Sequence, residues 1–313
     1  MSQVPKLGNR ACKLSSHTPL FPSPFFTKNY TPRSSAGTGS NPVPLRGLTS
    51  VLPLGLLLLA SAFGSAAEIT VAAAADLQFA LRDIARSYQS RTGNTVKLTF
   101  GSSGALAAQI QNGAPFDLFF SADARYPEQL VEAHAALPDS LTRYARGVLV
   151  LWVARGQIVS GEVGGIARIS LQTLLSPDIV RIALANPQHA PYGRAAVEAM
   201  RKAGIYDQVK GKFVLGENVS QAAQFAESGN VQAAFLPLAL ASAPGLKEKG
   251  QSWRVPAELY APIIQTAAVS SHARDPKLAR DFLTYVTTEG MPVLRSYGFE
   301  PVEPKPSVTG ERP

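Results

Sequence analysis

The segments best suited to hold a ligand are four places where small or polar residues stand at the expected start of a helix. The N–H groups of a first helical turn have no partner inside the helix and carry partial positive charge, so they bind anions without a charged side chain. In one segment Ser103 adds a hydroxyl donor beside a glycine, which lets a ligand approach the backbone. Each segment taken singly is more simply a helix cap, and only their recurrence suggests an anion site. The four segments are Ala74-Ala75-Asp76, Gly101-Ser102-Ser103-Gly104, Pro191-Tyr192-Gly193 and Glu217-Asn218-Val219-Ser220.

Asp76 has two interpretations that the sequence leaves open. As a helix N-cap, its carboxylate would accept N–H groups two or three residues further along, and the strong preference for Asp at helix starts favours this role. A carboxylate that faced a dianion would otherwise repel it. As a site residue, Asp76 would instead accept the proton of a protonated oxyanion.

The chain shows no arrangement typical of an enzyme or a metal site. His134, His189 and His272 are far apart, and none has the spacing of a metal-binding pair. We expect His189 on a surface loop, although its position before Ala190-Pro191 would also let it line a cleft. GxSxG, Walker A and GxGxxG motifs are absent, and a single cysteine, Cys12, allows neither a disulfide framework nor a cysteine-ligated metal. We therefore expect neither an enzyme nor a cofactor.

The net charge of +8 is concentrated outside the expected folded part. Six basic residues and no acidic residue precede Glu68, so residues 68–313 carry a net charge of +2. A charge this small removes the main support for a nucleic-acid partner. The balance of 45% hydrophobic and 17% charged residues is that of an ordinary globular protein.

Residues 1–67 are expected to be an N-terminal extension followed by a signal peptide. Arg46 precedes an apolar run over residues 51–60, and small residues follow up to Ala67, which is the three-part pattern of a cleaved secretory signal. The run is about ten residues long, whereas spanning a membrane needs about 20. Residues 1–45 are rich in Pro and Ser, and a segment of this composition cannot bury enough apolar surface to fold. They are either a leader or untranslated, in which case the true start lies near Val43 or Leu45. Cleavage after Ala67 predicts a periplasmic protein.

Strands and helices alternate after Glu68, which predicts two α/β lobes. Residues 147–154 form a continuous apolar run, and we expect the chain to cross between the lobes there and to return at about residues 261–270. The expected boundaries are 68–146 and 265–313 for one lobe and 147–264 for the other. Further strands are predicted at 68–73, 95–100, 116–120, 181–185, 232–236 and 262–270. Helices are predicted at 76–91, 105–111, 171–175, 193–203, 221–228, 276–287 and 292–297.

Several stretches of the sequence resemble the periplasmic molybdate-binding proteins, which belong to the type II periplasmic-binding-protein superfamily. They are EITVAAAADLQFAL, FGSSGALAAQ, NGAPFDLFFSAD, ANPQHAPYGRAAVEAM, GENVSQAA and LRSYGFEP, and they extend over residues 68–301. The resemblance implies a two-lobed α/β fold in which each lobe is a mixed, mostly parallel sheet flanked by helices. It also implies a fully deprotonated tetrahedral anion, held between the lobes by neutral donors.

The resemblance also implies the ligand-binding residues. They are Ala75 or Asp76, Ser103 through its hydroxyl and N–H, Tyr192, and Val219 through its N–H. Molybdenum would be present only as the bound oxyanion, held through Ser103, Tyr192 and Val219. Many relatives have Ser or Thr-Asn in place of Ala75-Asp76, and some have a tyrosine in place of Leu236. These two departures leave the choice among molybdate, tungstate and other large oxyanions open.

The function that follows is an extracytoplasmic solute-binding protein that captures molybdate, or tungstate, for an ABC importer. Its two lobes would close on the anion, and the closed form would dock on the membrane permease. We expect a monomer without a cofactor or a nucleic-acid partner. The alternatives are a binding protein for sulfate, thiosulfate or a phosphonate and, less favoured, a secreted enzyme on the same scaffold.

Overall fold

The computed structural model of the protein describes residues 66–156 and 169–302. The expectations for Cys12, for the N-terminal extension and for nearly all of the signal peptide fall outside these ranges. Among the described residues, no helix has the length and apolar character needed to cross a membrane. The described residues contain two five-stranded sheets within one compact unit of the chain, and each sheet with its helices is called a lobe below.

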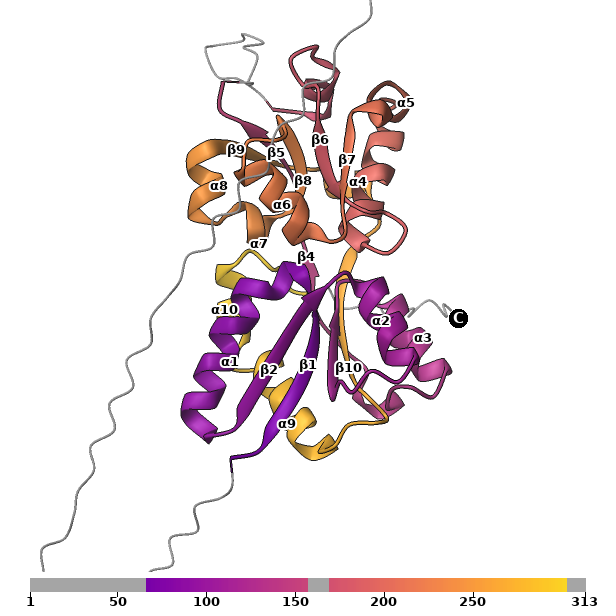
Figure 1. Ribbon diagram of the computed structural model, residues 1–313, viewed down its shortest axis with the longest axis vertical. Coiled ribbons are helices and arrows are strands. Elements are labelled where there is room, and N and C mark those ends of the chain that lie inside the picture. The colour runs from indigo at the N-terminus through magenta and orange to yellow at the C-terminus, as the bar shows by residue number, and fades with distance from the viewer. Residues whose placement is uncertain (1–65, 157–168, 303–313) are drawn as a thin grey trace, which may run out of the picture. The chain divides into compact units, whose positions relative to one another are not determined.

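The sheet of lobe 1 has the strand order β2-β1-β3-β10-β4. Its strands are β1 (Glu68–Ala74), β2 (Thr95–Gly101), β3 (Leu118–Ser121), β4 (Thr142–Gly147) and β10 (Ile263–Val269). β10 runs antiparallel to both of its neighbours, so the other four strands share one direction. One face of the sheet is covered by α1 (Gln78–Thr92), α9 (Pro276–Thr287) and α10 (Met291–Ser296), and the other by α2 (Ser103–Gln111) and α3 (Arg125–Glu132) (Figure 1).

The sheet of lobe 2 has the strand order β7-β6-β8-β5-β9. Its strands are β5 (Leu149–Ala154), β6 (Ile182–Ala185), β7 (Phe213–Gly216), β8 (Ala233–Pro237) and β9 (Gly250–Arg254). Here β5 is the strand that runs against the other four. The helices of this lobe are α4 (Pro191–Lys202), α5 (Tyr206–Val209), α6 (Val219–Glu227), α7 (Leu238–Ala241) and α8 (Pro244–Lys249) (Figure 1).

The predicted fold class is therefore confirmed, since each lobe has a mixed sheet with four of its five strands in one direction. The chain passes from the first sheet to the second at Val148, between β4 and β5, and it returns between β9 and β10. The lobe boundaries at residues 146/147 and 264/265 stay a prediction.

The apolar sequences of β5 and β1 explain why these strands are buried. β5 lies between β8 and β9, and its residues from Leu149 to Val153 are at most 1% exposed, which explains why this run has no alternation of polar residues. β1 is also buried, and its side chains alternate between two clusters, with Val71 packed under α1 and Ala72 under α2. The helix predicted at 76–91 is α1, which buries its apolar face and ends at Gly93, whose φ of 74° is the left-handed C-cap conformation.

The sequence analysis missed β7, β9 and most of β4. All three lie at an edge of a sheet or carry exposed polar residues, such as those of the β9 sequence GQSWR. It also missed α3, α5, α7 and α8, none of which exceeds eight residues.

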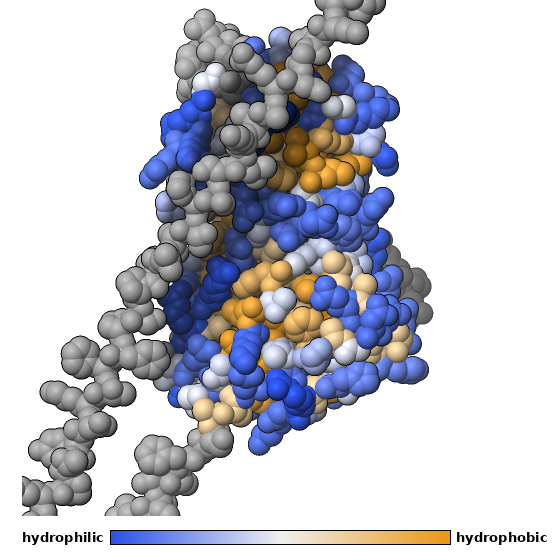
Figure 2. Space-filling view, viewed as in Figure 1, coloured by the Kyte–Doolittle hydropathy of each residue, from blue (hydrophilic) through white to orange (hydrophobic). Residues whose placement is uncertain are grey.

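On the face shown in Figure 2, apolar residues gather over β1 and β2, and a second group lies near β7, where Leu215 is 50% exposed.

Candidate functional site

The five residues predicted to bind a ligand line one small cavity between the two lobes. Lobe 1 contributes the ends of β1 and β2 and the residue after β3, and lobe 2 contributes the starts of α4 and α6. The cavity has a volume of about 10 Å³, far below the 300–1,000 Å³ typical of sites for drug-sized ligands. Its lining residues are Ala74, Ala75, Asp76, Gly101, Ser102, Ser103, Ala122, Ala190, Pro191, Tyr192, Asn218 and Val219.

Three helices begin at this cavity. Ser103 is the first residue of α2, Pro191 the first of α4 and Val219 the first of α6. At the start of α6 the Asn218 side chain accepts hydrogen bonds from the N–H groups of Ser220 and Gln221, which leaves the N–H of Val219 outside this cap. The positive ends of three helix dipoles therefore meet around one space, and none of the lysines and arginines that the structure describes lines it.

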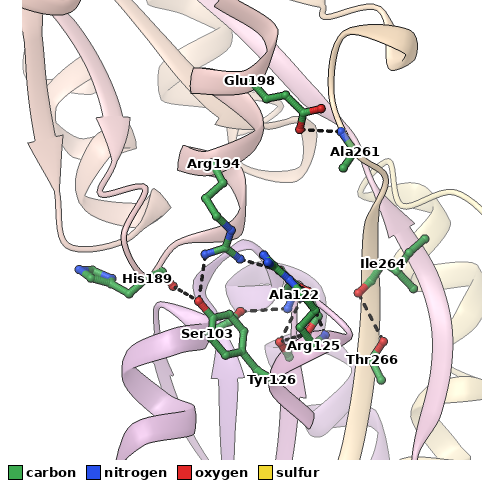
Figure 3. Close-up of polar contacts among 12 residues, drawn as sticks. Ser103, Ala122, Arg125, Tyr126, His189, Arg194, Glu198, Ala261, Ile264 and Thr266 are labelled. Carbon is green, nitrogen blue, oxygen red and sulfur yellow. Dashed lines mark hydrogen bonds and ion pairs between the residues drawn. The ribbon is translucent and has the colours of Figure 1, made fainter. Parts of the chain in front are cut away.

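Ser103 is fully buried, and its hydroxyl has a free proton to donate. Its Oγ accepts a hydrogen bond from the N–H of Ala122 at 3.0 Å (Figure 3). Because the oxygen serves as an acceptor in that bond, the hydroxyl hydrogen can point into the cavity. The adjacent Ser102 lies differently, since its Oγ contacts Nδ1 of His189 at 2.8 Å.

Asp76 does not cap a helix, so the favoured interpretation of this residue was wrong. It lies in a 3-10 turn, Ala75–Leu77, ahead of α1, and its side chain makes no capping bond. Its Oδ2 instead accepts a bond from Nε2 of Gln265 in β10 at 2.6 Å. The hydrogen-bond partner of this carboxylate therefore lies 189 positions away in the sequence.

Asp76 belongs to a buried polar cluster with Tyr144, Tyr192 and Gln265. Four atoms of the cluster have no hydrogen-bond partner among the described residues: Asp76 Oδ1, both tyrosine hydroxyls and Gln265 Oε1. The Tyr192 hydroxyl is close enough to lower the pKa of Asp76, but the pair lacks hydrogen-bond geometry. Buried polar atoms without partners are rare in folded proteins, so this cluster is a candidate for contact with a ligand.

The electrostatics of the cluster are dominated by burial. Burial raises the pKa of Asp76 from its ordinary value of 3.8 to about 6, and the Tyr192 and Gln265 side chains offset only part of this effect. Burial, together with the charge of Asp76, raises the pKa values of Tyr144 and Tyr192 well above the ordinary value. Both tyrosines therefore remain neutral donors at physiological pH.

An ion pair joins the lobes beside the cavity. Arg194 of α4 pairs with Asp123 of lobe 1, and its Nη1 donates to the Tyr126 hydroxyl at 2.9 Å (Figure 3). Burial alone would raise the pKa of Asp123, but the bonds from Arg125 and Arg194 outweigh burial and lower it. The carboxylate is thus held ionised between two guanidinium groups, one from each lobe.

Further hydrogen bonds join the lobes around the same space. The backbone oxygen of His189 in lobe 2 accepts from the N–H of Gly104 at 2.9 Å, and a Cβ on Gly104 would lie only 2.8 Å from that oxygen. A glycine is therefore needed for this contact. Elsewhere at the interface, the Ser220 hydroxyl donates to Oε1 of Gln78 at 2.9 Å. These contacts hold the lobes together around the cavity, as expected for a closed form.

A larger cavity adjoins this site but is less suited to a ligand. It is lined by Asp123, Arg125, Arg194 and Glu198, among others. Both arginines already pair with Asp123, and Glu198 accepts the N–H of Ala261 at 2.9 Å (Figure 3). Each of these charged side chains therefore already has a partner within the protein.

Residues 69–300 match the family of bacterial extracellular solute-binding proteins. The chain belongs to this family. It is 38% identical over 249 residues to the molybdate-binding protein ModA of Rhodobacter capsulatus, an overlap of 79% of this chain and 92% of the relative. It is 36% identical over 250 residues to ModA of Azotobacter vinelandii, covering 80% and 96% of the two chains. The solved structure of the Azotobacter vinelandii periplasmic molybdate-binding protein matches with a TM-score of 0.67 and 31% identity, over 76% of this chain and all of that one.

Other residues considered in the sequence lie away from the cavity or at its rim. Leu236 is fully buried in the core of lobe 2 and does not line the cavity. Contrary to expectation, His189 does not lie on a free surface loop but is half-buried where the lobes meet. His134 and His272 are exposed, and no cluster of three potential metal-binding side chains occurs within residues 66–156 and 169–302.

Sequence reasoning missed the residues that join the lobes or lie behind the site. Arg194 lies 68 positions after Tyr126 and 71 after Asp123, and no spacing in the sequence links it to them. Tyr144 and Gln265 lie on β4 and β10, far from any of the four recurring segments. A polar residue within an otherwise apolar strand, such as Gln265 in IIQTAAV, is the one signal that could have drawn attention to this cluster.

Proposed function

We propose that this solute-binding protein captures a tetrahedral oxyanion, molybdate above others, outside the cytoplasm and delivers it to the permease of an ABC importer. The supporting observation is the convergence of three helix N-termini and the Ser103 hydroxyl on one small cavity between two lobes. Donors of this kind bind an anion through fixed dipoles, with no basic side chain. The ModA proteins to which the chain is similar are named for molybdate binding.

The size and chemistry of the cavity favour a compact inorganic anion. A site lined by fixed neutral donors selects by size and by protonation state, so tungstate should bind alongside molybdate, and sulfate more weakly. No step of a chemical reaction is required of any lining residue, which favours a transport role over catalysis. We also propose that the protein is a monomer without a cofactor and that it reaches the periplasm through cleavage after Ala67.

A competition experiment tests the ligand class. Purified protein is incubated with equal concentrations of molybdate, tungstate, sulfate and phosphate, and the bound species is identified by native mass spectrometry. We expect the complexes with molybdate and tungstate to dominate. Tighter binding of sulfate than of molybdate in isothermal titration would refute the proposal in favour of another oxyanion.

The N–H of Val219 offers a test of the binding geometry. Proline is well accepted at the first position of a helix, and the preceding Asn218 already has the extended conformation that proline requires (φ −151°, ψ 178°). Val219→Pro therefore removes the N–H donor while keeping α6. A hydrogen bond to a charged group contributes roughly 1.5–3 kcal/mol, so molybdate affinity should fall about ten- to a hundredfold. Val219→Ala keeps the N–H and is the matched control; equal affinities of the two variants would show that this N–H does not contact the anion.

A further inference from the structure

We propose that Asp76 binds the oxyanion as a carboxylic acid, so that the complex holds one proton between this carboxyl group and the anion. This inference rests on the proposed function, because it concerns the same cavity. It identifies Asp76 as a specificity-determining residue, a role that the neutral residues of the cavity cannot take.

The geometry leaves one carboxyl oxygen for the ligand. Oδ2 of Asp76 is occupied by the amide of Gln265, whereas Oδ1 has no partner among the described residues. The side chain is 1% exposed and lines the cavity. An anion in this cavity therefore has the Asp76 carboxyl group as a neighbour.

Within residues 66–156 and 169–302, no cationic side chain bonds to the Asp76 carboxylate. The side chains that face Asp76 are Tyr192 from α4, Tyr144 from β4 and Gln265 from β10, and all three are neutral. The polar contact of the 3-10 turn with α6 is also neutral, since the Ser220 hydroxyl lies 3.5 Å from the backbone oxygen of Ala75. An ionised Asp76 would repel an anion with little screening, whereas a protonated Asp76 would donate a hydrogen bond to it, as the Ser103 hydroxyl can.

Asp76 can become protonated at neutral pH when an anion binds. Burial has already raised its pKa to about 6 without a ligand. A negative charge brought next to a carboxyl group raises its pKa further, because it disfavours a second negative charge. Binding of a fully deprotonated anion such as molybdate then takes up a proton from solvent.

A consequence for ligand choice follows. An oxyanion that carries its own proton, such as hydrogen phosphate, can supply the proton to the shared bond and leave Asp76 ionised. Relatives with Ser or Thr-Asn at this position have no carboxylate to accept such a proton. The chain should therefore discriminate less strongly against protonated oxyanions than a site built only from neutral donors. This discrimination should weaken further as the pH rises.

Titration calorimetry with molybdate tests the proton directly. Binding is measured between pH 6 and pH 8 in two buffers with different ionisation enthalpies, which yields the number of protons taken up per anion. We expect about half a proton at pH 6 and about one at pH 8, with a loss of affinity of about 50-fold over this range, as required when one group with a pKa near 6 must be protonated. Asp76→Asn cannot ionise, so its molybdate affinity should be independent of pH and its proton uptake zero.

The controls separate this inference from the proposed function. Histidines change charge in the same pH range, so His189→Gln, which removes the imidazole beside Ser102, should keep the proton uptake. Molybdate binding by the wild type with no proton uptake at pH 8 would overturn the inference and leave the proposed function intact. Absence of molybdate binding at every pH would overturn the proposed function and the inference with it. The wild-type measurement decides the matter even if Asp76→Asn fails to fold.

Discussion

The buried carboxyl group of Asp76 should limit the stability of the ligand-free protein at neutral pH. Its pKa is raised from 3.8 to about 6 in the folded state, so between these values the folded protein binds more protons than the unfolded chain. The free energy of unfolding therefore falls as the pH rises through this window and stays low above it. A shift of about two pH units corresponds to roughly 3 kcal/mol, since each unit is worth about 1.36 kcal/mol.

Asp76→Asn removes the charge and keeps an acceptor for the Gln265 amide. We expect the difference in unfolding free energy between variant and wild type to shift by up to about 3 kcal/mol in favour of the variant between pH 4 and pH 7. Costs of the substitution that do not depend on pH cancel in this comparison. Urea unfolding followed by tryptophan fluorescence, in buffers free of oxyanions, measures it.

Asp123→Asn is the control, because its stability should change with pH in the opposite direction. Asp123 is also largely buried, but its bonds to Arg125 and Arg194 lower its pKa. Asp123→Asn should therefore lose stability relative to the wild type as the pH rises through the acidic range, in the opposite direction to Asp76→Asn. Parallel stability curves for Asp76→Asn and the wild type from pH 4 to pH 7 would show that burial does not raise the pKa of Asp76.

Three further substitutions test the site and its closure. Ser103→Ala removes one hydroxyl donor, so molybdate affinity should fall about ten- to a hundredfold in titration calorimetry, and an unchanged Kd would show that the hydroxyl does not face the ligand. Arg194→Met breaks the ion pair with Asp123, so molybdate binding should weaken about fivefold. The radius of gyration of the ligand-free protein in X-ray scattering should rise, and an unchanged radius would argue against a role of this ion pair in closure. Gly147→Ala would place a methyl group against the Tyr192 hydroxyl, so affinity should drop more than tenfold with the fold retained, and full affinity would mean that this tyrosine is not needed in its present position.

The parts of the fold that the sequence predicted are those in which local pattern and burial agree. The apolar run of β5 and the apolar face of α1 could be assigned because each is buried on the sides that its residues indicate. β4, with the sequence TRYARG, could not be assigned, because it is a strand only through its pairing with β10, which lies far along the chain. Pairing of this kind is a property of the tertiary structure, and no local propensity reports it.

The candidate site was predicted to a similar extent. Ser103, Tyr192 and Val219 were taken from the resemblance to the molybdate-binding proteins, and each also lies in one of the four segments expected at helix starts. The three helices begin two residues earlier than predicted, which makes Ser103 and Val219 first helical residues. Asp76 was misjudged because capping preferences describe a helix end in isolation. Once Gln265 approaches from β10, the carboxylate has a partner that no local rule contains.

The position of β10 has a consequence for the order in which the protein acquires its structure. β10 lies between β3 and β4, yet it begins at Ile263, 116 positions after β4 ends at Gly147. The strands of lobe 2, by contrast, all come from the continuous stretch between Leu149 and Arg254. As the chain is synthesised from its N-terminus, lobe 2 can complete its sheet while the sheet of lobe 1 still lacks an inner strand. Because distant contacts form slowly, we expect lobe 2 to fold first and the docking of β10 to be the late step that completes both lobe 1 and the cavity between the lobes.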